Sequence, residues 1–256
     1  MFRKNSVLLL LLLTAFSTIA QKGTYLIPFG AMQISTIANS SDFYIKGLNF
    51  KNVIRSAYGV GLLYNPIDML GIETGLKYSN QGQKYTGHID FDANTQDSIN
   101  LDFTSECKLT YFQIPLLLRF NSTLEQDKVY MNISTGFQFD FLTAASMKVN
   151  PLPPDSLNLG SNVKKYFKSF NASFVASAGL NIQLAEKFFV YMGLQMSKTL
   201  GDIESKSISF DDKTMGFEYI YPVGVKKEER PQNSTTRGKT KNVVYTLLIG
   251  ISYKLK

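Results

Sequence analysis

The side chains best able to carry out chemistry are few in this sequence, and they are scattered. Its single histidine, His88, lies in a polar segment beside Asp90 and Asp92, and its single cysteine is Cys107. A histidine paired with a serine would suit a lipid-modifying enzyme, but no serine has a readable spatial relation to His88. The nearby aspartates lack the regular spacing of an EF-hand calcium loop. We therefore predict no catalytic residue, no metal site and no cofactor, with a lipid-modifying barrel enzyme as the alternative.

Basic side chains gather in the last long polar segment, where they are placed to bind anions. The cluster consists of Lys226, Lys227, Arg230, Arg237, Lys239 and Lys241. Exposed lysine and arginine side chains bind phosphate well, so on a cell surface this cluster predicts contact with lipopolysaccharide or a partner protein. A merely solvated loop is the simpler interpretation. No fold that reads nucleic acid accompanies the cluster, and we predict no nucleic-acid partner.

Four charged residues stand inside segments that otherwise lack charge. They are Glu73, Lys77, Arg119 and Asp140. Charges held away from water need partners, and two acids with two bases can supply them to one another. We predict that the four project into the lumen of a barrel and form an ion-pair network. A narrow conducting pore is the alternative, although a barrel of about eight strands rarely leaves one.

The segments that carry these residues alternate between apolar and polar positions, which is typical of β-strands. From Val129 to Phe141 the odd positions are mostly apolar, whereas the even positions hold mainly Asn, Ser, Gly, Gln and Asp. The same pattern recurs over residues 58–64, 70–78, 112–120, 171–184, 188–197 and 243–253, and a further strand is expected at 25–36. Pro115 interrupts one of these strands and predicts a local bulge or bend.

The connections between these strands alternate in length. Three are short, at residues 65–69, 121–127 and 185–187, and four are long and polar, at 37–55, 84–106, 147–168 and 202–241. Short turns on one rim and long loops on the other are typical of outer-membrane barrels. We predict an all-β fold, an eight-stranded antiparallel up-and-down transmembrane β-barrel with short periplasmic turns and four long outer loops.

The composition of the two faces indicates which one meets the surroundings. A water-exposed face usually carries about 25–35% charged residues, but the polar rows here hold mainly Gly, Ser, Thr, Asn and Gln. The apolar rows of the seven clear strands contain no charged residue, as a lipid-facing row requires, because a mid-bilayer lysine or arginine costs about 2–4 kcal/mol. A soluble periplasmic lipocalin-like binding barrel, with the apolar rows inside, is the alternative.

The first twenty residues have the pattern of a secretory signal. Arg3 and Lys4 precede the apolar run from Val7 to Leu13, and Thr18-Ile19-Ala20 ends the segment with small residues. The apolar run is too short to cross a bilayer as a helix. We therefore divide the chain into a signal peptide, residues 1–20, and an outer-membrane β-barrel domain, residues 21–256, exported to the bacterial outer membrane with its signal peptide cleaved.

Some strings resemble those of the PorT-like outer-membrane β-barrel proteins. The most specific string is Tyr111 to Arg119, Y-F-Q-I-P-L-L-L-R, and a second runs from Gly75 to Lys84. The resemblance implies an eight-stranded outer-membrane barrel without assigned activity; the namesake is associated with type IX secretion, a role that we do not transfer. We predict a non-enzymatic integral barrel with a structural or surface-interaction role, whose partners are outer-membrane lipid, lipopolysaccharide and an envelope or secretion-complex protein.

Overall fold

The alternating segments form long antiparallel strands in the computed structural model, which describes residues 22–39, 49–91, 99–123, 128–150, 162–205 and 239–255. The strands are β1 (Gly23–Ala38), β2 (Asn49–Lys51), β3 (Val53–Ile67), β4 (Leu70–Phe91), β5 (Ile99–Thr123), β6 (Val129–Asn150), β7 (Phe170–Ala185), β8 (Phe188–Thr199) and β9 (Lys241–Lys254). A short 3-10 helix, η2 (Lys164–Tyr166), precedes β7. Within these residues, no helix is long and apolar enough to cross a membrane.

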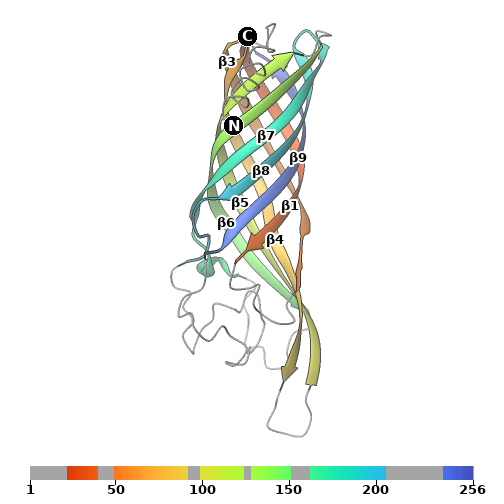
Figure 1. The fold of residues 1–256 in the computed structure, drawn as a ribbon, viewed down its shortest axis with the longest axis vertical. Coiled ribbons are helices and arrows are strands. Elements are labelled where there is room, and N and C mark those ends of the chain that lie inside the picture. Colours follow the sequence, from red (N-terminus) through yellow and green to blue (C-terminus); the bar gives the residue numbers. More distant parts are fainter. Residues whose placement is uncertain are drawn as a thin grey trace, which may run out of the picture.

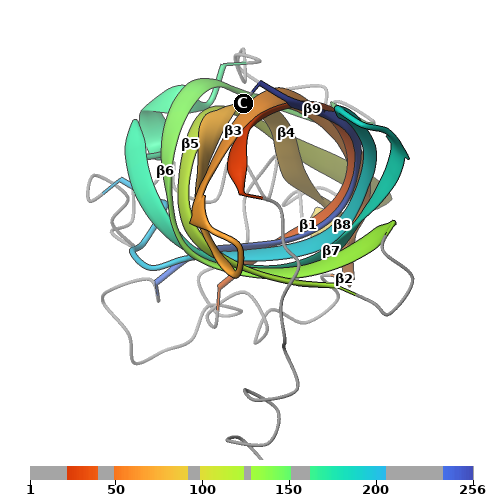
Figure 2. The ribbon, with the colours of Figure 1, turned by 90° about the horizontal axis from the view of Figure 1, so that it is seen from above.

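The strands close into a barrel with up-and-down connectivity (Figures 1 and 2). Strand β1 pairs with β3, strands β3 to β8 each pair with the next in sequence, and β9 pairs with β1, from Tyr25↔Lys254 to Ala38↔Lys241. Strands β2 and β3 are separated only by Asn52, and both pair with β4. They count as one strand of the barrel, so the nine segments form eight barrel strands. The prediction of a closed eight-stranded antiparallel barrel is confirmed. Closure leaves no sheet edge to face hydrocarbon with unpaired backbone groups.

The apolar rows face outward, as predicted. Exposed side chains from every long strand include Ile34, Leu62, Leu76, Leu116, Ile133, Phe174, Leu194 and Ile249. The polar rows are buried inside the barrel, where Gln33, Ser79, Gln113, Ser134, Gln138 and Asn181 lie. A soluble barrel would have its apolar rows inside, so this arrangement contradicts the lipocalin-like alternative.

The apolar band has the height of a membrane. On β6 the outward row from Met131 to Phe141 is apolar except at Thr135, and the exposed positions beyond it include Ser146 and Lys148. Ten residue steps at about 3.4 Å each, on a strand tilted by about 40°, span about 26 Å along the barrel axis. An outer-membrane barrel carries an apolar band of about 25 Å.

The two rims of the barrel differ. At one rim, β3 and β4 are joined by Asp68 and Met69, and β7 and β8 by Glu186 and Lys187. The start of β1 and the end of β9 also lie at this rim, where the backbone N–H of Leu255 donates to the carbonyl oxygen of Thr24 at 2.8 Å. At the opposite rim, segments 40–48, 92–98, 151–161 and 206–238 lie outside the described residues. We call the rim with the two-residue connections the short-turn rim, and the opposite rim the loop rim.

The prediction of a long loop at residues 84–106 is wrong for most of that range. Strand β4 continues to Phe91 and β5 begins at Ile99, and the two pair up to Phe91↔Ile99. They extend past the other strands as a two-stranded ribbon, visible below the barrel in Figure 1. The mixed polar and apolar sequence of this region obscured the alternation, and pairing between the two arms sustains the strands without a membrane around them.

Pro115 does not produce the predicted bulge. Pairing of β4 with β5 is interrupted between Thr74↔Leu116 and Lys77↔Gln113, but the register on both sides is the same. Proline has no N–H to donate, so a gap in the ladder is the expected result. The Thr74 hydroxyl donates to the carbonyl oxygen of Pro115 at 2.9 Å and partly replaces the missing contact. The register shift in β5–β6 pairing lies instead at Thr110 and Tyr111.

Candidate functional site: the lumen and its outer mouth

The lumen at the short-turn rim is filled by aromatic and aliphatic side chains. The buried cluster consists of Tyr25, Ile27, Leu63, Phe189, Tyr191 and Leu248. The rings of Tyr25 and Phe189 meet edge to face with centroids 5.8 Å apart. Such packing fills the space between opposite walls, because a barrel of this size has an interior just wide enough for side chains.

Glu73 and Arg119, two of the four predicted lumenal charges, form an ion pair beside this cluster, where Glu73 of β4 pairs with Leu63 of β3. Nη1 of Arg119 lies 3.1 Å from Oε2 of Glu73. Nε of Arg119 donates to Oδ1 of Asn121 at 3.1 Å, and the guanidinium carbon lies 5.4 Å from the centre of the Tyr191 ring. Arg119 is completely buried, so these contacts replace the water that its charge would otherwise hold.

Asp140 and Lys77, the other two predicted charges, lie buried farther along the lumen. Neutral side chains hold the Asp140 carboxylate: Gln113 donates to it at 2.6 Å, Gln138 donates at 2.7 Å, and the Ser173 hydroxyl donates to its other oxygen. Lys77 is near enough for its charge to interact with that of Asp140, but among the described residues it forms no ion pair. The structure thus places the four charges in one lumen as one ion pair, a carboxylate held by neutral side chains, and a separate Lys77, rather than as one network of ion pairs.

Near the loop rim, strand β4 is hydrogen-bonded to β1 and β9, which are not its neighbours in the sheet. Gly82 has φ of +154°. Both its N–H and its carbonyl oxygen bond the Ser35 hydroxyl of β1, each at 2.7 Å. A Cβ at Gly82 would lie 2.0 Å from the carbonyl oxygen of Cys107, so only glycine permits this approach.

Amide side chains reinforce the cross-lumen bonding on either side of Gly82. Gln33 of β1 donates to the Ser79 hydroxyl at 2.7 Å and to the carbonyl oxygen of Asn80 at 2.5 Å. Asn242 of β9 donates to the Gln81 side chain. We call this set of contacts between β4 and strands β1 and β9 the amide clamp. It narrows the lumen below the mouth.

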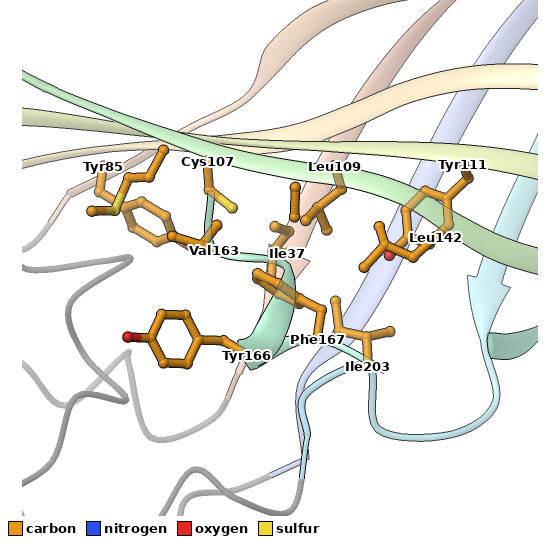
Figure 3. Packing of buried hydrophobic residues seen from close by; sticks show 12 residues of the cluster. Ile37, Tyr85, Cys107, Leu109, Tyr111, Leu142, Val163, Tyr166, Phe167 and Ile203 are labelled. Carbon is orange, nitrogen blue, oxygen red and sulfur yellow. The ribbon is translucent and has the colours of Figure 1, made fainter. Parts of the chain in front are cut away.

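A second apolar cluster packs toward the loop rim beside the amide clamp, where Ser79 of β4 pairs with its member Tyr111. Figure 3 shows the packing of its side chains. Its buried members from the strands include Ile37, Tyr85, Cys107, Leu109, Tyr111 and Leu142, and those from the connecting segments are Val163, Tyr166, Phe167 and Ile203. We call it the mouth plug. Beside it Arg55 and Glu106 form an ion pair that sequence reasoning did not predict.

The space left inside the barrel is small. A cavity of about 30 Å³ lies between strands at Gly75, Pro115 and Tyr191, and the side chains of Glu73 and Lys77 also line it. This volume is close to the share of a single water molecule. The described side chains of the aromatic cluster and of the mouth plug thus occupy the lumen toward its two ends.

Most of the predicted basic cluster lies outside the described residues, as Lys226, Lys227, Arg230 and Arg237 do. Lys239 is exposed at the loop rim, and the Lys241 ammonium donates to the carbonyl oxygen of Leu200. His88 lies in β4 with its backbone opposite Asp102 of β5, in the ribbon rather than in a loop. No group of three or more His, Cys, Asp or Glu side chains that could hold a metal occurs in the described part of the chain.

A closed barrel with an apolar exterior and a filled polar interior defines an integral outer-membrane protein. The model of the outer membrane protein beta-barrel domain family matches residues 29–203, more than half of the chain. The chain belongs to this family, and its location is the bacterial outer membrane. A comparison with curated proteins finds no match.

Several solved outer-membrane barrels are similar to this chain at low identity. OprG of Pseudomonas aeruginosa is 13% identical, with 92% of this chain and 97% of OprG covered and a TM-score of 0.42. Neisserial surface protein A is 11% identical, with coverages of 91% and 98% and a TM-score of 0.44. The outer membrane protease OmpT of Escherichia coli is 6% identical, with coverages of 93% and 98% and a TM-score of 0.34.

Proposed function

We propose that the protein is a non-enzymatic, non-conducting outer-membrane barrel whose role is structural or is exerted through its loop rim. The observation that carries this proposal is the blocked lumen. The aromatic cluster and the buried ion pair lie together toward the short-turn rim, and the amide clamp and the mouth plug lie together toward the loop rim. A barrel whose interior is packed in this way offers its outer rim, rather than a passage, for function.

Planar bilayer recording tests the absence of a pore. Full-length protein folded into bilayers should give no stable conductance step. A double variant that opens the amide clamp and the mouth plug, Gln33→Ala with Phe167→Ala, should give at most short, irregular openings. Stable conductance from the wild type at neutral pH would refute the proposal.

The partners that we propose are outer-membrane lipid, lipopolysaccharide and an envelope or secretion-complex protein. Support comes from the basic residues of the last connecting segment, of which Lys239 is exposed at the loop rim. Deletion of residues 206–238 should weaken adhesion of the protein to lipopolysaccharide or its capture of an envelope protein, while the barrel still folds. If this deletion and the deletion of residues 151–161 change no envelope or surface-binding phenotype, the interaction role fails.

The enzyme alternative rests on His88. Replacing His88 by Ala and measuring the composition of lipid A in the cell separates the two functions, because a lipid-modifying enzyme would lose its product. We propose that the composition stays unchanged.

Two finer assignments also remain proposals. The similarity to the PorT-like proteins supports membership of that subgroup, and the pattern of residues 1–20 supports cleavage of a signal peptide after Ala20. N-terminal sequencing of protein from outer membranes should then begin at Gln21. A mature chain that begins at Met1 would contradict the cleavage.

A further inference from the structure

An open groove of about 800 Å³ lies on the outside of the loop rim, beside η2. Its lining includes three lysines and two aromatic residues. The lining residues are Asn162, Lys164, Lys165, Phe167, Lys168, Ser169, Phe170 and Ser205. None of them is acidic. The groove is distinct from the basic cluster predicted at 226–241, and no sequence pattern pointed to it.

The segment that carries the lysines is held on both sides by backbone hydrogen bonds. On the β6 side, the N–H of Val163 donates to the carbonyl oxygen of Ala145 at 3.0 Å. On the other side, the N–H of Lys168 donates to the carbonyl oxygen of Ile203 at 2.8 Å, and that of Ser205 donates to the carbonyl oxygen of Tyr166 at 2.9 Å. The lysines therefore project from a fixed frame, whereas a cationic loop would have to be ordered on binding.

The side chains of this segment divide between two directions. Val163, Tyr166 and Phe167 are buried in the mouth plug. Lys164 and Lys165 are exposed, and the Lys165 ammonium lies 4.8 Å from the centre of the Tyr166 ring. The half-buried Lys168 donates to the carbonyl oxygen of Asp202 at 2.7 Å. Burial of the apolar side chains thus presents the cationic ones together at the outer surface.

Among the described residues, Asp202 and Glu204 lie close in sequence to the lining residue Ser205 but do not line the groove themselves. Oδ1 of Asp202 accepts the backbone N–H groups of Glu204 at 3.1 Å and of Thr240 at 3.0 Å. Glu204 is buried at 4% exposure. The lining residues themselves carry three lysines and no carboxylate.

The groove lies at the edge of the apolar band. Phe170 begins the outward row of β7, is half exposed, and lies 6.3 Å from Phe139 and 5.3 Å from Phe141 between ring centres. Aromatic side chains mark the interface between hydrocarbon and headgroups in outer-membrane barrels. Lys168 and Ser169 directly precede Phe170, so the groove opens at the depth where lipid phosphates lie.

We propose that this groove binds the phosphate of an anionic lipid in the outer leaflet, with Lys164, Lys165 and Lys168 around the phosphate and Phe170 against the start of an acyl chain. The inference rests on the proposed function in one respect, namely that the loop rim faces the outer leaflet. Lysine ammonium groups pair with phosphate as point charges, and an adjoining aromatic surface selects a lipid over a free ion.

The test measures retention of phosphorylated lipid A by the full-length protein in detergent, using native mass spectrometry. The variant carries Lys164→Gln, Lys165→Gln and Lys168→Gln. The matched control carries Lys22→Gln, Lys128→Gln and Lys187→Gln, which remove the same charge at the short-turn rim. At about a factor of five for each lysine, the first variant should lose affinity on the order of a hundredfold, while the control keeps wild-type affinity. Replacing the same three groove lysines by arginine should restore binding.

Two further arms identify the ligand. Dephosphorylated lipid A should bind no better to the wild type than to the triple variant, and inorganic phosphate should not displace the phosphorylated lipid. Equal losses in the variant and the control, wild-type retention of dephosphorylated lipid A as strong as that of phosphorylated lipid A, or displacement by inorganic phosphate would each overturn the proposal.

A separate measurement tests the orientation on which the proposal depends. Ser146→Cys, placed beyond the apolar band at the loop rim, should react with an impermeant maleimide on intact cells. Labelling only after permeabilisation would refute the proposed function itself. External labelling without lipid retention would refute the groove alone.

Discussion

The ion pair between Glu73 and Arg119 allows a quantitative test of how the lumen is held together. The Arg119 side chain is fully buried, whereas that of Glu73 is 19% exposed. Glu73→Met leaves the guanidinium buried without its carboxylate, and should lower the free energy of unfolding by about 3–5 kcal/mol. Arg119→Met leaves a carboxylate with some access to solvent, so we expect a smaller loss of about 1–3 kcal/mol.

The double variant distinguishes coupling from independent damage. Replacing a buried ion pair by apolar side chains of similar volume is often nearly neutral, so Glu73→Met with Arg119→Met should be more stable than Glu73→Met alone. The two effects would then be strongly non-additive, with a coupling energy of about 2 kcal/mol or more. Non-additivity is informative, because the losses of stability from two unrelated packing defects in the lumen would simply add.

Unfolding by urea in lipid vesicles supplies the free energies. The chain has no tryptophan, so far-ultraviolet circular dichroism and the gel mobility of unheated samples are suitable probes. Ser134→Ala is the matched control, since its lumenal hydroxyl has no hydrogen-bond partner among the described residues. We expect it to be close to neutral. If the double variant is as unstable as the sum of the single variants, the two residues are not coupled and the assigned role of the pair is wrong.

Three further predictions concern the exterior, Gly82 and the thiol. Leu194→Arg, at a 66% exposed position in the apolar band, should destabilise the folded barrel by about 2–4 kcal/mol in vesicle unfolding, whereas Ser146→Arg beyond the band should cost at most about 1 kcal/mol; equal effects would contradict the placement of the band. Gly82→Ala should lower the free energy of unfolding by at least about 1–3 kcal/mol in the same assay, because the positive φ of Gly82 and the nearby Cys107 carbonyl oxygen both exclude a Cβ. A neutral result would mean that the backbone of β4 at Gly82 is not placed as described. Cys107 lies beyond the apolar band at the loop rim, and burial raises the pKa of its thiol to about 12. The thiol should therefore resist iodoacetamide at pH 8 in folded protein and react after denaturation, as mass spectrometry would show.

The positions of the strands, and which side chains point outward, could be predicted from the sequence because the membrane restricts the residue types on each face of the barrel. Each outward side chain within the band meets hydrocarbon, so rows such as the one from Met131 to Phe141 must be apolar. Each inward position meets the opposite wall, so it must be small or able to form hydrogen bonds. The period of two is therefore clear in the band, and it fades at 84–106, where β4 and β5 leave the membrane and the rule ends.

The lumenal contacts could be predicted only in part. Composition indicates that charges such as Glu73 and Arg119 lie inside, but pairing depends on register, and alternation does not determine which wall positions face each other across the axis. The amide clamp escaped prediction for this reason, since Gln33 and Ser79 are typical lumenal residues with nothing in their sequence to show that they meet. The lysines of the groove escaped because their neighbours Tyr166 and Phe167 lie in a segment without any periodic pattern.

The seam between β1 and β9 has a consequence for biogenesis. It joins residues near 25–38 to residues near 241–254, so the contacts that complete the wall are among the most distant in the chain. Bringing such remote segments together is slow, and until it happens the first and last strands each present an unsatisfied edge. A nascent copy in transit through the envelope therefore needs a holding factor, and any lesion that delays delivery of the C-terminal strand should promote aggregation rather than yield a smaller barrel.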